Sequence, residues 1–122
     1  VSMDELLSRS DYISLNCDLN PASQHLFGAA EFDRMKQSAV IINAARGPVI
    51  DEAALVQALQ SGAIAGAALD VFEDEPLPSS SPLRGMDNVM LAPHNSNSSP
   101  ASWQKVHEST LAQLLDGLKV AG

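Results

Sequence analysis

Residues 39–71 read AVIINAARGPVIDEAALVQALQSGAIAGAALDV, and this stretch decides the fold. Its first part, residues 39–44, is a nearly continuous apolar run rich in β-branched residues. Such a run predicts a strand that is buried on both faces, as in a parallel sheet. Asp51 can cap a helix over residues 52–61, and a second apolar strand follows at residues 65–71. Strand, helix and strand in this order predict a βαβ unit.

The flanking sequence continues the same alternation. Apolar runs predict strands at residues 11–15 and 88–93, and helical patterns predict helices at residues 3–9, 29–36 and 100–118. Ser2 and Glu5 have the spacing of a capping box, and Gly62 stands where a helix commonly ends. The last helix carries one apolar stripe, which we assign to the core: Trp103, Val106, Leu111, Leu114 and Leu118. The pattern predicts an α/β fold with a parallel sheet flanked by helices.

The composition restricts the classes of function. The 122 residues are enough for one domain, and a hydrophobic content of 45% is ordinary for a globular fold. A formal net charge of −8, without a basic cluster, argues against binding to nucleic acid or to anionic membranes. The first residues lack the regions of a signal peptide, and the single cysteine, Cys17, allows no internal disulfide. These features predict a cytoplasmic protein.

Polar residues follow the predicted strands at the points where the strands end. Arg46 follows one strand, Asp70 and Glu75 follow the next, and His94 follows the last. Carboxyl ends of parallel strands share one edge, where α/β sheets bind ligands, so these side chains are expected to converge there. An arginine can grip a carboxylate, and a histidine beside a carboxylate can carry a proton. Such a group can oxidise or reduce the carbon next to a carboxylate, with a cofactor supplying the hydride.

The motifs that carry these residues resemble those of one known family. INAARGPVIDEAALVQALQSGAIAGAALDVFEDEP, followed by NVMLAPH, is similar to the D-isomer-specific 2-hydroxyacid dehydrogenases over nearly the whole chain. The resemblance implies a Rossmann-like parallel sheet that binds NAD, with NADP left open. It also implies a small 2-hydroxy or 2-oxo acid as the substrate and a homodimeric parent protein.

The same resemblance implies roles for individual residues. Arg46 matches the substrate-binding arginine, His94 matches the acid/base histidine, and Glu75 matches the glutamate that pairs with this histidine. A wider set is implied to line or contact the cofactor: Cys17, Ala44, Ala45, Arg46, Asp70, His94 and Ser96.

Other chemistry-bearing residues receive simpler interpretations. Glu73 and Asp74 are expected to be solvated, and His25 and His107 to have surface or helix-edge roles. The carboxylates and histidines lack the close ligand spacing of a metal site, so no metal is predicted.

Two features depart from the family pattern. Asn95, Ser96 and Asn97 follow His94, where the family usually has a glycine, so side chains are expected beside the nicotinamide. No GxGxxG motif occurs either, although pyrophosphate binding in this architecture depends on it. Residues 1–122 are therefore expected to form the C-terminal half of a dinucleotide-binding domain, without the first βα units and the substrate domain. We expect this chain to be inactive alone and to bind dinucleotide weakly.

Two other interpretations stay open. A non-catalytic NAD(H)-sensing module on the same scaffold could keep Arg46, Glu75 and His94 for binding alone. A structural remnant without a function of its own is the third possibility. Turnover of 2-oxo acids by the parent protein discriminates between an enzyme and a sensing module.

Overall fold

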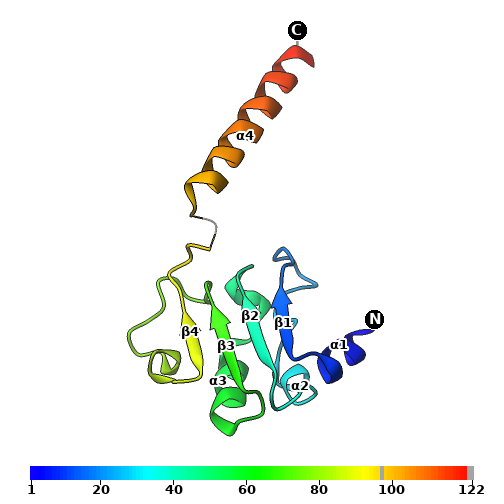
Figure 1. The fold of residues 1–122 in the computed structure, drawn as a ribbon, viewed down its shortest axis with the longest axis vertical. Coiled ribbons are helices and arrows are strands. Elements are labelled where there is room, and N and C mark those ends of the chain that lie inside the picture. Colours follow the sequence, from blue (N-terminus) through cyan, green and yellow to red (C-terminus); the bar gives the residue numbers. More distant parts are fainter. Residues whose placement is uncertain (97, 121–122) are drawn as a thin grey trace.

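Four parallel strands form one sheet in the order β1-β2-β3-β4 (Figure 1). A computed structural model describes residues 1–96 and 98–120 of the chain. The strands are β1 (Tyr12–Leu15), β2 (Val40–Asn43), β3 (Gly66–Leu69) and β4 (Val89–Leu91). Each strand lies inside its predicted range and is shorter than that range. The predicted α/β fold with a parallel sheet is confirmed.

The register of the strands aligns their carboxyl ends. Asn43 at the end of β2 lies between Leu15 of β1 and Leu69 of β3. Leu69 is in turn paired with Leu91 of β4. The loops that follow the strands therefore leave from one edge of the sheet, at the top in Figure 1.

Capping residues define two helices. α1 (Met3–Arg9) starts after Ser2, whose hydroxyl accepts the Glu5 N–H while the Glu5 carboxylate accepts the Ser2 N–H. α3 (Glu52–Ser61) starts after Asp51, whose carboxylate accepts a backbone N–H of the first turn. Both helices have the predicted bounds, because local hydrogen bonds at their ends fix them.

The second helix is shorter than predicted. We expected it over residues 29–36, whereas α2 spans Ala29–Phe32. Beyond this point the N–H groups of Arg34 and Met35 donate to carbonyls three residues back, as in a 3-10 helix. The described residues also include two 3-10 helices, η1 (Gly47–Val49) and η2 (Pro82–Gly85).

The core lies between one face of the sheet and α2 and α3 (Figure 1). Side chains alternate between the two faces of each strand, so every second strand residue points into this core. The sheet contributes Ile13, Leu15, Ile41, Ala67 and Leu69, and the helical layer contributes Leu55, Leu59, Phe32 and the preceding Phe27. Packing against this helical layer holds the sheet in place, and the sheet in turn positions the loops that follow its strands.

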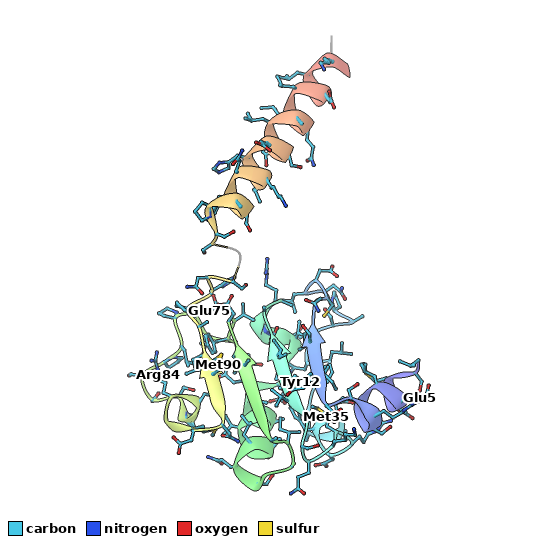
Figure 2. All side chains as sticks on the ribbon, in the orientation of Figure 1. Glu5, Tyr12, Met35, Glu75, Arg84 and Met90 are labelled. Atoms are coloured by element: carbon cyan, nitrogen blue, oxygen red, sulfur yellow. The ribbon has the colours of Figure 1, made fainter. Side chains whose placement is uncertain are left out.

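The opposite face of the sheet is open in the part of the chain that the structure describes. Tyr12 of β1 is 72% exposed and Met90 of β4 is 73% exposed (Figure 2). Between them, Val40 and Ile42 of β2 are only half-buried. The prediction that residues 39–44 are buried on both faces is wrong for the described chain, because helices cover only one face.

The last helix, α4 (Pro100–Val120), extends away from the sheet (Figure 1). The apolar stripe that we assigned to the core is exposed, with Trp103 at 52% and Leu118 at 62%. That assignment is wrong. A helical period shows that apolar residues share a face but does not show which element covers it. Among the described residues, neither α4 nor any other helix combines the length and apolar character needed to cross a membrane.

We expect residues 1–122, produced alone, to self-associate. Burial of apolar surface contributes roughly 25 cal/mol per Å², and both the open sheet face and the α4 stripe offer such surface. Light scattering should therefore give a mass above that of the monomer. Replacing Leu111, Leu114 and Leu118 with serine should lower the associated fraction. A monodisperse monomer of the unchanged chain would contradict this expectation.

Candidate active site

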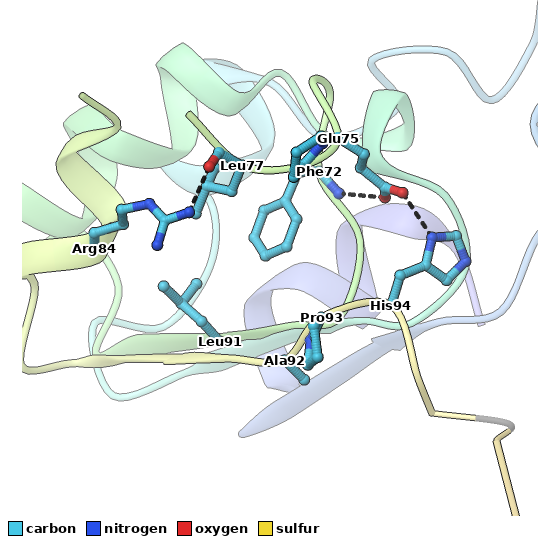
Figure 3. Close-up of a pocket in the computed structure, with 9 residues that line it drawn as sticks. Phe72, Glu75, Leu77, Arg84, Leu91, Ala92, Pro93 and His94 are labelled. Carbon is cyan, nitrogen blue, oxygen red and sulfur yellow. Dashed lines mark hydrogen bonds and ion pairs between the residues drawn. The ribbon is translucent and has the colours of Figure 1, made fainter. Parts of the chain in front are cut away.

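His94 and Glu75 form a hydrogen-bonded pair at the carboxyl-end edge of the sheet (Figure 3). Nδ1 of His94 lies 2.7 Å from Oε2 of Glu75, and the two side chains are 46% and 36% exposed. His94 belongs to the turn after β4 and has a left-handed φ of 54°. Glu75 belongs to the loop after β3. The aligned strand ends thus bring these two side chains together.

The second carboxylate oxygen of Glu75 fixes the orientation of the pair. Oε1 accepts the N–H of Phe72 at 3.1 Å (Figure 3). The hydrogen bond to His94, followed by the one from Phe72, lowers the pKa of Glu75 below its ordinary value. Because Nδ1 of His94 is engaged, Nε2 is the ring atom left to exchange a proton with a ligand.

A cavity of about 510 Å³ lies beside the pair (Figure 3). Its walls are mainly apolar and comprise Phe72, Leu77, Leu91, Ala92 and Pro93. Arg84 of η2 closes one side, and its guanidinium donates to the carbonyls of Leu77 and Pro78. An apolar wall next to a hydrogen-bonded histidine and carboxylate is typical of a site for a small molecule.

Asp70 holds the chain directly after His94. Oδ1 accepts the N–H of Asn95 at 2.8 Å, and Oδ2 accepts the N–H of Ser96 at 2.9 Å. Burial alone would raise the pKa of Asp70, but hydrogen bonds from Ser96 and Asn95 and the nearby His94 outweigh it and lower the pKa. The turn is therefore held through the backbone N–H groups of both residues and, at Ser96, through the side chain as well. Asn97 lies outside the described residues.

Asn43 shapes the turn that carries Arg46, and sequence reasoning missed it. Its Nδ2 donates to the Arg46 carbonyl at 2.9 Å, and its Oδ1 accepts the Ala45 N–H at 3.1 Å. Asn43 is only 1% exposed. A polar residue at the end of the apolar run VIIN was the available signal, because a buried amide must find partners.

A second cavity of about 440 Å³ opens at the ends of β1 and β2. It is lined by Asn16, Cys17, Asp18, Leu19, Ala44, Ala45 and Arg46. Ala44 is exposed and Ala45 half-buried, so these small side chains leave room for a flat ring. The surface has the size and the mixed polar and apolar lining that part of a dinucleotide requires. The residues present therefore fit a nicotinamide dinucleotide at this edge.

The loops after β2 and β3 touch at Gly47. A Cβ at this position would lie 1.8 Å from the carbonyl oxygen of Phe72. Only a glycine lets the two backbones approach so closely. The turn that carries Arg46 is thus packed directly against the loop that carries Glu75.

His25 and Glu73 are exposed, as expected, but they form a contact that was not expected. Nε2 of His25 lies 2.6 Å from Oε1 of Glu73, so each of these exposed side chains has a partner. The two residues are 48 positions apart. Sequence spacing gives no signal for such a contact, because it depends on how two loops fold. His107 is exposed on α4, as expected.

The expected site residues fall into two groups at the same edge. His94 and Glu75 line one cavity, whereas Cys17, Ala44, Ala45 and Arg46 line the other, and no lining residue is shared. Asp70 and Ser96 lie in the hydrogen-bonded turn next to His94. Residues 1–96 and 98–120 contain no cluster of side chains suited to a metal ion.

Comparison with known proteins identifies the family. A profile described as "D-isomer specific 2-hydroxyacid dehydrogenase, NAD binding domain" matches residues 1–96. The chain belongs to the D-isomer-specific 2-hydroxyacid dehydrogenase family, and its residues 1–96 match the NAD-binding domain of that family. Glyoxylate/hydroxypyruvate reductase B of Citrobacter koseri is 46% identical over 117 residues, which are 96% of this chain and 36% of that protein. The chain thus spans about a third of the length of such relatives.

Solved structures agree with this assignment. The NAD-complexed D-isomer specific 2-hydroxyacid dehydrogenase of Lactobacillus delbrueckii ssp. bulgaricus has a TM-score of 0.86 at 32% identity, covering 98% of this chain and 40% of that one. The family member from Xanthobacter autotrophicus Py2, solved with NADPH and MES, has a TM-score of 0.74 at 48% identity, covering 75% and 30%. The predicted Rossmann-like fold is confirmed.

We expect Gly47→Ala to destabilise the domain in the full-length protein by roughly 2–4 kcal/mol, because the added methyl group must push two backbones apart. Urea denaturation measures the change. Gly85→Ala is the matched control, since a Cβ there meets nothing within 4 Å. The control should change stability by less than about 0.5 kcal/mol. Equal stability of the two variants would contradict the close contact.

A second prediction concerns pH and Asp70. Its pKa in the folded protein is below the ordinary 3.8, so the ionised carboxylate stabilises the fold. This contribution is complete above the ordinary pKa and is lost as the pH falls through the folded-state pKa. Asp70→Asn should therefore lose about 2 kcal/mol of stability near pH 7, and the difference from wild type should shrink below about pH 4.

Denaturation of both proteins across this pH range in the full-length protein measures the difference. Asp74→Asn is the control, because Asp74 is exposed and has no hydrogen bond with any described residue. A pH-independent difference between wild type and Asp70→Asn would argue against an ionised Asp70 in the turn.

Proposed function

We propose that the full-length protein reduces a small 2-oxo acid to the D-2-hydroxy acid with a reduced nicotinamide cofactor, and catalyses the reverse oxidation. The observation that carries this proposal is the pairing of His94 with Glu75, 2.7 Å apart at the carboxyl-end edge of the sheet. The similarity to proteins named glyoxylate/hydroxypyruvate reductase and glyoxylate reductase supports glyoxylate and hydroxypyruvate as substrates.

His94 is the proton donor in the reduction. Glu75 engages Nδ1 and fixes the orientation of the ring, so a proton on Nε2 can pass to the carbonyl oxygen of the substrate. This oxygen becomes the hydroxyl group, and the ring becomes neutral with its remaining proton toward Glu75. A bound reduced nicotinamide supplies the hydride that the carbonyl carbon accepts. In the oxidation, the neutral ring takes the hydroxyl proton back.

Arg46 anchors the substrate carboxylate. Its guanidinium is exposed at the end of β2, and Nη1 donates to the Ala45 carbonyl at 2.7 Å. The other N–H groups of the guanidinium stay available to a ligand. Two parallel hydrogen bonds to a carboxylate would fix the orientation of the neighbouring carbonyl group.

The cofactor would be held by residues of both groups: Cys17, Ala44, Ala45, Arg46, Asp70, His94 and Ser96. Ala44 and Ala45 leave room for a flat ring in the second cavity. Asp70 keeps lone pairs beyond the two N–H groups that it binds, so it can accept from a carboxamide. Both NAD and NADP belong to the proposal, because solved relatives contain NAD in one case and NADPH in another.

We also propose that residues 1–122 form the C-terminal half of the cofactor-binding domain of a longer protein. The chain spans 36% of the Citrobacter koseri relative and has no GxGxxG motif, which supports this division. The rest of the protein would supply the phosphate-binding turn and the substrate domain. The isolated chain would be inactive, and the whole protein would be a cytoplasmic homodimer.

His94→Ala in the full-length protein tests the proposed function. We expect kcat for a 2-oxo acid to fall by roughly 10²–10⁴, because the proton donor is lost. Affinity for NADH should change much less than kcat, since His94 is only one of the residues proposed to contact the cofactor but is the only proton donor. His107→Ala is the matched control and should retain wild-type kinetics, because His107 lies on α4 outside the site. Steady-state kinetics and NADH fluorescence measure the two effects.

The kinetics and the NADH affinity of wild type and His94→Ala distinguish an enzyme from a non-catalytic sensing module. Comparable losses of NADH affinity and turnover in His94→Ala would contradict the assignment of His94. A wild-type protein that binds NADH but turns over no 2-oxo acid would support the non-catalytic sensing module instead.

A further inference from the structure

His25 lies where three loops of the candidate site meet. It belongs to the loop after β1, its backbone binds the loop after β2, and its ring binds the loop after β3. The second of these loops carries Arg46 and the third carries Glu75. His25 therefore contacts two of the loops on which the proposed reaction depends, those that carry Arg46 and Glu75.

The backbone contact joins the His25 segment to the chain just after Arg46. The N–H of His25 donates to the Pro48 carbonyl at 2.8 Å. The N–H of Phe27 donates to the Val49 carbonyl at 3.2 Å, and Phe27 forms a parallel bridge with Ile50. These two hydrogen bonds and the isolated bridge attach residues 25–27 to residues 48–50. His25 thus has a fixed position relative to the Arg46 turn.

The ring contact reaches the other loop. Nε2 of His25 donates to Oε1 of Glu73 across 2.6 Å, and both a neutral and a protonated ring can supply this N–H. The N–H of Glu73 in turn donates to Oε2 of Glu52 on α3 at 3.2 Å. Glu73 precedes Glu75 by two residues. Holding Glu73 therefore limits how far Glu75 can move away from the Arg46 turn.

The carboxylates of Glu52, Glu73 and Asp74 lie close together, and their negative charges oppose the position of this loop beside α3. Burial raises the pKa of Glu52, and the neighbouring charges of Glu73 and Asp74 raise it further. Like charges close together repel one another, and a donor that binds one of these carboxylates offsets the repulsion. The imidazole N–H of His25 is such a donor.

The backbone of His25, whose ring contacts Glu73, adopts a strained conformation. Its φ of 50° is left-handed, a conformation that glycine and asparagine adopt more readily than histidine. Neither glycine nor asparagine has a side chain long enough to replace the ring. Strained backbone that is held by surrounding contacts is common at functional sites.

We propose that His25 and Glu73 are positioning residues that hold the Arg46 turn and the Glu75 loop at a fixed separation. This proposal rests on the proposed function, in which Arg46 grips the carboxylate while His94, oriented by Glu75, protonates the neighbouring carbonyl oxygen. The two groups must engage adjacent atoms of one small substrate. A loss of fixed separation therefore lowers the fraction of bound substrate in a reactive orientation.

The principal test is His25→Asn in the full-length protein. Asparagine tolerates the left-handed backbone but does not reach Glu73, so the contact is lost without new strain. We expect kcat/KM for glyoxylate or hydroxypyruvate to fall roughly tenfold, with the KM for NADH changed less than about twofold. His25→Gln should recover most of the loss, because its side-chain N–H can donate to Glu73.

A second set of variants shows whether the two residues act together. Glu73→Ala should lower kcat/KM as His25→Asn does, and the double variant should be no worse than either single variant. Asp74→Ala removes a neighbouring charge of the same loop and should leave kcat/KM unchanged.

Three results would overturn the proposal: wild-type kcat/KM in His25→Asn, equal losses for the oxo acid and for NADH, or additive effects in the double variant. Failure of the proposed function is distinguishable from these results. In that case either the wild type would turn over no 2-oxo acid or His94→Ala would retain turnover. Failure of the positioning role alone leaves the wild type active, His94→Ala inactive and His25→Asn unimpaired.

Discussion

Parallel pairing in one register is the constraint on which the rest of the molecule depends. Asn43 lies level with Leu15 and Leu69, so the ends of the strands form one line. Every loop that carries a functional candidate starts from that line. Residues far apart in sequence, such as Glu75 and His94, are thereby brought within hydrogen-bonding distance. A change of register in one strand would shift its loop along the edge and separate these groups.

The geometry of the edge is then fixed by side chains that bind backbone groups. Asn43 binds both an N–H and a carbonyl of the Arg46 turn, Asp70 binds two successive N–H groups, and Glu75 binds the N–H of Phe72. Such contacts restrict the loops before any ligand arrives. The approach of Gly47 to Phe72 adds a steric limit to the same arrangement. The site is therefore organised in advance, which is the condition under which positioned groups act efficiently.

The sequence predicted the sheet and two helices well, because the signals for these elements are local. The apolar run before Arg46 and the caps at Ser2 and Asp51 depend on residues within a few positions of one another. The exposed α4 stripe and the open sheet face could not be predicted, since a periodic pattern does not identify its covering partner.

In the candidate site, too, some features could be predicted from the sequence and others could not. Placing residues at the ends of parallel strands predicted which side chains gather at the edge, including Arg46, Glu75 and His94. The contacts of Asn43 and His25 depend on the paths of loops, and composition carries no information about these paths.

The hydrogen bonds of the turn after His94 also determine how freely the amino-acid sequence of this turn can vary. Asp70 recognises amide N–H groups, which every residue except proline possesses. Among the described residues, neither Asn95 nor Ser96 adopts a left-handed φ, so neither position requires glycine. At Asn95, where the backbone N–H binds Asp70, substitutions can therefore accumulate over evolutionary time while the histidine stays in place, whereas the Ser96 side chain also binds the Asp70 carboxylate. The edge of the binding surface can acquire new side chains, and with them new ligand preferences, without rebuilding the turn that supports them.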